Sequence, residues 1–173
     1  EDAIKLIKGP KGTEVRLTVK RVDGTVEEVP IVRDVVELEE VYARSSVIQT
    51  GEKKFGLITL PKFYINFNDY GERNAAVDVK KEIEQLKSQN VSGIVLDLRN
   101  NGGGSLKTVV DMTGFFIEEG PVVQVKSTGG RKEVLKDTDS SIVWDGPLVV
   151  LVNEFSASAS EIIAAALQDY NRA

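Results

Sequence analysis

The sequence predicts an α/β domain with a parallel sheet, preceded by a small helix-and-hairpin unit. Residues 91–98 and 147–152 are short apolar runs typical of strands that are buried on both faces. Apolar residues recur at helical spacing in residues 74–89, which lie between a predicted strand at residues 55–60 and the run at residues 91–98. Because a strand, a helix and a second strand in this order favour a parallel pair, these segments indicate an α/β architecture.

The N-terminal region predicts a helix followed by a hairpin. Residues 2–7 have a short helical pattern, and residues 15–19 alternate like a half-buried strand. Asp23-Gly24 is a turn dipeptide, after which residues 26–32 supply the returning strand, with Pro30 at an edge position. Such a unit is too short to hold a core alone, so we interpret it as the end of a domain that begins earlier.

This gives three regions: residues 1–33, a charged linker over residues 34–52, and a larger domain over residues 53–173. The larger domain begins with a strand closed by Pro61. Its later elements are a helix that Gly120-Pro121 should end, a hairpin around Gly129-Gly130, a buried strand, and a helix over residues 158–169. The aromatic residues Phe63, Tyr64, Phe67 and Tyr70 could line a groove or cover the core, and we favour cover.

Composition excludes several kinds of protein. The formal net charge of −5 disfavours nonspecific binding to nucleic acid or anionic lipid. The chain has no cysteine and no histidine, which removes disulfides, thiolate metal sites and imidazole ligands, and nothing calls for a cofactor. No apolar run approaches the length of a membrane span, and no signal peptide precedes Glu1.

The segment 155–161 contains a candidate nucleophile without its usual partner. Three serines lie between an apolar strand and an alanine-rich helix. A serine hydroxyl needs a base to take its proton, and histidine, the commonest base, is absent. Serine catalysis would therefore need a lysine whose pKa is lowered to roughly 7–8. Lys107, Lys126 and Lys132 occupy exposed or hairpin positions, and none resembles a buried base.

Two strand-to-helix junctions could form one site. Residues 97–105 place three glycines at the start of a helix, where unpaired N–H groups could bind an anion. The serine run repeats this layout, and ligands of parallel sheets bind outside the carboxyl ends of the strands. Ser158 would then face the glycine amides. The alternatives are a mere tight loop and a helix cap, since Ser158 and Glu161 fit a capping box.

Asp169 lies eleven residues after Ser158 on the same predicted helix. The rise of an α-helix puts about 16 Å between them, which is too far for a hydrogen bond. We therefore interpret Asp169 as structural.

The chain resembles the tail-specific proteases, also called carboxyl-terminal processing peptidases, and most closely their bacterial periplasmic branch. The resemblance spans nearly the whole sequence and rests on three segments: residues 7–12, residues 97–104 and residues 149–173. It implies the end of a PDZ module over residues 1–33. It also implies a crotonase-like (ClpP/crotonase) ββα core that uses a serine-lysine dyad.

By the same resemblance, Ser158 matches the family nucleophile. The amide of Ala159 and one from Gly103 or Gly104 match the oxyanion hole. Asp169 matches a position sometimes linked to activity, and because of its distance from Ser158 we expect any such role to be indirect. The implied substrates are unfolded or tagged proteins with apolar C-termini, with an adaptor lipoprotein as a candidate partner. The implied location is periplasmic or otherwise extracytoplasmic, with membrane association as a further expectation.

The family's catalytic lysine follows the serine helix, and this chain stops at Ala173. We therefore expect the 173 residues to be an inactive fragment of an active serine peptidase that needs no metal. Two alternatives remain open: a non-catalytic binding module on the same fold, and a crotonase-type acyl-coenzyme A enzyme, which would use the paired amides without a serine nucleophile.

Overall fold

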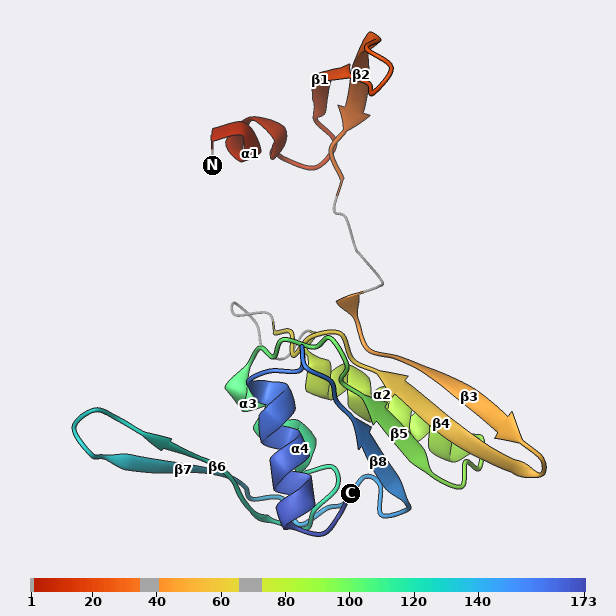
Figure 1. Ribbon diagram of the computed structural model, residues 1–173, viewed down its shortest axis with the longest axis vertical. Coiled ribbons are helices and arrows are strands. Elements are labelled where there is room, and N and C mark those ends of the chain that lie inside the picture. The colour runs from red at the N-terminus through yellow and green to blue at the C-terminus, as the bar shows by residue number, and fades with distance from the viewer. Residues whose placement is uncertain (1, 35–40, 66–72) are drawn as a thin grey trace. The chain divides into compact units, whose positions relative to one another are not determined.

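The computed structural model describes residues 2–34, 41–65 and 73–173. The chain forms two compact units, Glu1–Leu38 and Glu39–Ala173 (Figure 1). In the described residues, no helix combines the length and the apolar character needed to cross a membrane.

The first unit consists of helix α1 (Asp2–Ile7) and an antiparallel hairpin of β1 (Glu14–Lys20) and β2 (Val26–Val32), as the sequence predicted. Gly24 adopts a positive φ of 88° in the turn, which explains the glycine of the turn dipeptide. None of the side chains described in this unit is buried. The unit therefore lacks a core of its own, in agreement with its predicted character.

The second unit is built around a four-stranded sheet. Its strands, in the order β3-β4-β5-β8, have the bounds Arg44–Thr50, Lys53–Thr59, Ile94–Asp97 and Leu148–Leu151. Strands β4 and β5 are parallel, and so are β5 and β8, which confirms the predicted parallel pairing and the α/β class. The edge strand β3 is antiparallel to β4.

Strand β3 lies inside residues 34–52, which the sequence had assigned to a linker. It pairs with β4 along its whole length, from Arg44 opposite Thr59 to Thr50 opposite Lys53. The second unit thus begins before residue 53. The pattern was missed because this edge strand is mostly exposed and polar, with Val47 and Ile48 as its only large apolar residues.

Three helices and a separate hairpin complete this unit. Helix α2 (Ala75–Ser88) contacts β3 and β4, and α3 (Leu106–Thr113) contacts α4 (Ala159–Asp169). The hairpin of β6 (Gly120–Lys126) and β7 (Lys132–Asp137) extends away from the sheet and contacts α3 and α4 near its base (Figure 1). The sequence predicted each of these elements, with one error at the end of α3.

Helix α3 ends at Thr113, not at the predicted Gly120-Pro121. Gly114 is the C-cap, and its N–H bonds to the carbonyls of Val110 and Met112. A Cβ at Gly114 would lie 2.6 Å from the carboxylate at the end of the Asp137 side chain, which would have to shift. Gly120, with a φ of 138°, instead opens β6.

The core lies between the sheet and its helices. Phe63 is 1% exposed and belongs to this core, so the predicted core role of this aromatic residue is confirmed. Tyr64 is only half-buried. Phe67 and Tyr70 lie outside the described residues. The largest fully buried side chains include Ile58, Leu60, Ile83, Leu86, Leu96, Leu98, Met112, Phe116, Ile163 and Leu167.

Candidate active site

The serine junction connects β8 to α4. Ser158 is exposed and is the N-cap of α4, where it has the predicted capping-box arrangement with Glu161, although within the described residues the Ser158 side chain itself makes no cap hydrogen bond. The Ser158 N–H donates to the Glu161 carboxylate at 2.7 Å. The helix-cap interpretation is therefore confirmed, although a cap and a nucleophile can be the same residue.

The backbone of Ser158 is in a sparsely populated region, with φ 54° and ψ −112°. Such a conformation costs about 1–3 kcal/mol and persists only where the surroundings impose it. A strained serine on a sharp strand-to-helix turn is also the layout that exposes the nucleophile of α/β-hydrolases. A simple cap does not need this strain, because ordinary caps have β-region dihedrals.

The glycine junction connects β5 to α3. Asn100, Gly103 and Gly104 all have positive φ, at 62°, 99° and 146°. Ser105 is the N-cap of α3 with φ −67° and ψ 122°, and its Oγ accepts a hydrogen bond from the Thr108 N–H at 3.2 Å. This junction therefore ends in a relaxed serine cap.

The two junctions lie directly against each other. A Cβ built on Gly103 would be 2.8 Å from both the Ser158 Cβ and the Ala157 carbonyl oxygen, and 3.1 Å from the Ala159 nitrogen. This confirms the prediction that Ser158 faces the glycine run. Glycine at position 103 is required both by its φ and by this approach.

Asn101 holds the two junctions together. It is fully buried, and its side chain donates to the Leu60 carbonyl at 2.8 Å and accepts from the Gly103 N–H at 2.9 Å. Its backbone carbonyl accepts from the Ala157 N–H at 3.1 Å and from the Ser160 Oγ at 2.8 Å. Sequence reasoning missed Asn101, because nothing in the local pattern indicates that this residue is buried and bonds to Leu60, to Gly103 and to the serine junction.

Further bonds connect the same two loops. Asn153 and Asn100 exchange two hydrogen bonds, at 2.9 and 3.0 Å. The Ser156 hydroxyl donates to the Leu98 carbonyl at 2.8 Å. Ser156 and Ser160 thus both donate to carbonyls of the glycine junction. Of the three serines, Ser158 is the exposed and strained one.

The backbone amides near Ser158 differ in availability. The Gly103 N–H is occupied by the Asn101 side chain. The Gly103 carbonyl and the Ser105 N–H both bond to Phe63, at 3.0 and 2.9 Å. Since backbone groups alternate in direction along an extended segment, the Gly104 N–H points away from Phe63. Within the part of the chain that the structure describes, neither Gly104 nor Ala159 uses its N–H in a hydrogen bond.

An ion pair supports the start of the glycine junction. Arg99 donates to both carboxylate oxygens of Asp97, at 2.9 and 2.6 Å, and its N–H donates to the same group at 3.0 Å. The bonds from Arg99 lower the pKa of Asp97 below its ordinary value, although partial burial opposes this shift. Asp97 is therefore a carboxylate at neutral pH and fixes the chain as it leaves β5.

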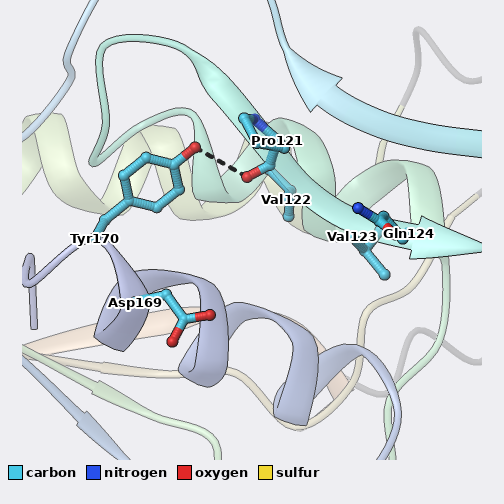
Figure 2. Close-up of a pocket in the computed structure, with 6 residues that line it drawn as sticks. All are labelled: Pro121, Val122, Val123, Gln124, Asp169 and Tyr170. Carbon is cyan, nitrogen blue, oxygen red and sulfur yellow. Dashed lines mark hydrogen bonds between the residues drawn. The ribbon is translucent and has the colours of Figure 1, made fainter.

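Asp169 is the last residue of α4, at the opposite end from Ser158, so the predicted separation of about 16 Å along one continuous helix holds. Asp169 and Tyr170 line a small cavity of about 290 Å³ next to β6. Figure 2 shows the two side chains with the other residues that line this cavity. The Tyr170 hydroxyl donates to the Pro121 carbonyl at 2.9 Å across this cavity (Figure 2). The structure does not bring Asp169 to the serine junction.

Residues 54–173 match the model of peptidase family S41. The chain belongs to this family. It is 40% identical over 173 residues to the tail-specific protease of Haemophilus influenzae, and 37% identical over 174 residues to the carboxyl-terminal-processing protease of a Picosynechococcus strain. These matches cover 99% and 100% of this chain, but only 24% and 39% of the relatives.

A solved structure titled photosystem II D1 C-terminal processing protease has the same fold, with a TM-score of 0.64 and 26% identity. That match covers 95% of this chain and 43% of the other. The sequence alone indicated a resemblance to the tail-specific proteases. The S41 match and the names of the relatives confirm that resemblance, and the observed α/β architecture agrees with it.

No base for Ser158 is evident in the part of this S41 chain that the structure describes. Every lysine whose side chain is described is exposed, including Lys107, Lys126 and Lys132. Lys107 pairs with Asp111 at 2.8 Å, as expected of a helix surface. Across residues 2–34, 41–65 and 73–173, no three acidic groups gather as a metal would require.

Proposed function

We propose that this chain carries the nucleophile and the oxyanion-binding amides of a tail-specific serine endopeptidase. The observation that carries the proposal is the contact between Gly103 and Ser158, which brings an exposed, strained serine against a loop with positive φ. The family assignment supports a peptidase, and the helix N-terminus favours negative charge next to Ser158.

In this mechanism, the Ser158 Oγ attacks the carbonyl carbon of the scissile peptide bond and gives its proton to a neutral lysine amine. The N–H groups of Ala159 and Gly104 stabilise the resulting oxyanion. Gly104 is the better donor of the two predicted glycines, because the Gly103 N–H is already bonded. The lysine then protonates the departing amine, and water, deprotonated by the same lysine, releases the acyl group from Ser158.

The base would come from outside these 173 residues, and the chain alone would then be inactive. The remaining expectations belong to the same proposal: a crotonase-like core, a PDZ part in the first unit, and unfolded or tagged substrates with apolar C-termini. An extracytoplasmic location and an adaptor lipoprotein as partner rest on the family resemblance.

The test is degradation of an unfolded protein with an apolar C-terminus by the full-length protein. Ser158→Ala should lose at least about 10³-fold in kcat, while Ser105→Ala, which removes the other N-cap hydroxyl, should keep most of its activity.

Equal cleavage by wild type and Ser158→Ala would contradict the proposal. No cleavage by either protein would favour the second interpretation, a binding module in which Ser158 serves only as the N-cap of α4.

A further inference from the structure

A groove lies next to the proposed oxyanion donor Gly104. Its volume is about 560 Å³, and it is lined by Lys62, Phe63, Tyr64, Ile65, Gly104, Ser105 and Leu106. One wall is therefore the segment 62–65, and the other is the end of the glycine junction. A substrate bound with its carbonyl at Gly104 would place a neighbouring side chain in this groove.

The wall is attached to the glycine junction through Phe63. Its N–H and its carbonyl bond to Gly103 and Ser105, and its side chain is in the core. The following residues bond to the start of α2: the Tyr64 carbonyl accepts from the Ala75 N–H at 3.0 Å, and Ile65 pairs with Asn74. Any displacement of the wall would therefore act on the glycine junction as well as on the width of the groove.

The hydroxyl of Tyr64 links three segments. It donates to the Asp78 carboxylate at 2.7 Å and accepts from the Ala43 N–H at 3.1 Å. Burial raises the pKa of Tyr64, so the hydroxyl keeps its proton at neutral pH. The groove wall, the chain entering β3 and the first turn of α2 thus meet at one oxygen atom.

Asp78 is held in turn by cations. It is 7% exposed, with Arg73 at 2.8 Å and Lys81 at 3.7 Å. Burial would raise the pKa of Asp78, but the bonds from Arg73 and Tyr64 lower it overall. The Arg73 guanidinium also lies 3.5 Å from the ring centroid of Tyr42, which packs edge-on against Tyr64 at 5.2 Å.

This network is not needed to begin α2. Asn74 already caps the helix by accepting from the Val77 N–H at 3.0 Å. Val79, Ile83 and Leu86 anchor its buried face. What the Tyr64–Asp78 bond adds is a fixed position for the aromatic side chain that lines the groove.

We propose that Tyr64 and Asp78 are positioning residues that hold the groove wall beside Gly104 and so set the size of the substrate side chain accepted there. The inference rests on the proposed function, because it takes Gly104 as part of the peptide-binding site. It assigns a selectivity role to residues that do not touch the reacting atoms.

The test uses the full-length protein and two peptides that differ only in the residue on the acyl side of the cleaved bond, alanine in one and leucine in the other. Tyr64→Phe removes one hydroxyl and keeps the ring. Tyr170→Phe is the matched control, because it also removes a single tyrosine hydroxyl, which donates to the Pro121 carbonyl at the far end of α4. Values of kcat and KM are measured separately, together with Tm.

We expect Tyr64→Phe to change the ratio of kcat/KM between the two peptides about tenfold, mainly through KM. Asp78→Ala removes the acceptor of the same hydrogen bond and should change the ratio in the same direction. Tyr170→Phe should leave it within about twofold of wild type. A purely structural role would lower the amount of active protein and reduce both rates equally, with KM and the ratio unchanged.

A wild-type ratio in both Tyr64→Phe and Asp78→Ala would overturn the inference. The proposed function fails separately, if Ser158→Ala cleaves both peptides as fast as wild type. An inert Ser158→Ala together with unchanged ratios would therefore reject the groove-wall role alone.

Discussion

The glycine junction and the serine junction have the same layout but different backbones. Each leaves a parallel strand and enters a helix through a serine N-cap. Ser105 has the dihedrals of an ordinary cap, whereas Ser158 has a positive φ and faces Gly103. The difference shows that the surroundings hold Ser158 in a conformation that capping alone does not explain, which is why we assign the nucleophile to it and not to Ser105.

The largest expected effect is on stability, and it comes from removing the Asn101 side chain that connects the two junctions. Asn101→Ala would leave the buried Leu60 carbonyl and the Gly103 N–H without their bonds, so the free energy of unfolding should fall by about 2–4 kcal/mol. Asn153→Ala removes a half-buried amide from the same loops and should cost about 1 kcal/mol. Denaturant unfolding of both variants measures the difference. Equal losses would mean that Asn101 is not the main link.

A smaller change should act mainly on the chemistry. Gly103→Ala places a methyl group against the Ser158 Cβ and imposes a strained φ, so we expect about a 100-fold loss of kcat in the full-length protein. Gly102→Ala is the control, because a Cβ at Gly102 meets nothing within 4 Å. Peptide hydrolysis by both variants tests this. Full activity of Gly103→Ala would show that the contact does not position the nucleophile.

Substituting glycine for Ser158 and for Ser105 tests directly which of the two caps has a strained backbone. Ser158→Gly removes the side chain that disfavours positive φ and should raise the free energy of unfolding by about 1 kcal/mol, although it removes the nucleophile. Ser105→Gly should lower the free energy of unfolding by a few tenths of a kcal/mol. Chemical denaturation of the two variants distinguishes these signs. A loss of similar size in both would contradict the claim that Ser158 is strained.

The smallest expected effect is on pH dependence. The folded pKa of Asp97 is lowered, so its contribution is complete above the unfolded value of about 3.9 and is lost as the pH falls through the folded value. Asp97→Asn should therefore have a lower Tm than wild type at pH 7, and the difference should shrink below about pH 4. A difference that stays constant from pH 7 to pH 3 would exclude the ion pair with Arg99 as its source.

Much of this fold could be predicted because it depends on local patterns. The apolar runs predicted β5 and β8, and the helical spacing of apolar residues predicted α2. Ligands of parallel sheets bind outside the carboxyl ends of the strands, and this rule predicted that Ser158 faces the glycine run. Strand β3 was missed because an exposed edge strand has little apolar alternation. The end of α3 was misplaced because Gly120, which the sequence suggested as a helix end, has a positive φ and opens β6 instead.

The parts of the site that could not be predicted depend on tertiary contacts. Asn101 and Asn153 are ordinary loop residues in the sequence, and their roles exist only once β5 and β8 are neighbours. The occupied N–H of Gly103, which favours Gly104 as an oxyanion donor, likewise follows from the folded position of the Asn101 side chain. A sequence pattern can indicate which loop binds an anion, but not which of its amides is available.

The most direct test of the nucleophile assignment is covalent labelling of the full-length protein with a fluorophosphonate, followed by peptide mapping with tandem mass spectrometry. An activated serine displaces fluoride and keeps the phosphonyl group. Peptide mapping then shows separately, for each serine of the two junctions, whether it carries the label. The account predicts a label on Ser158 and none on Ser105, Ser156 or Ser160. A catalytically active protein labelled at a different serine, or not labelled at Ser158, would contradict it.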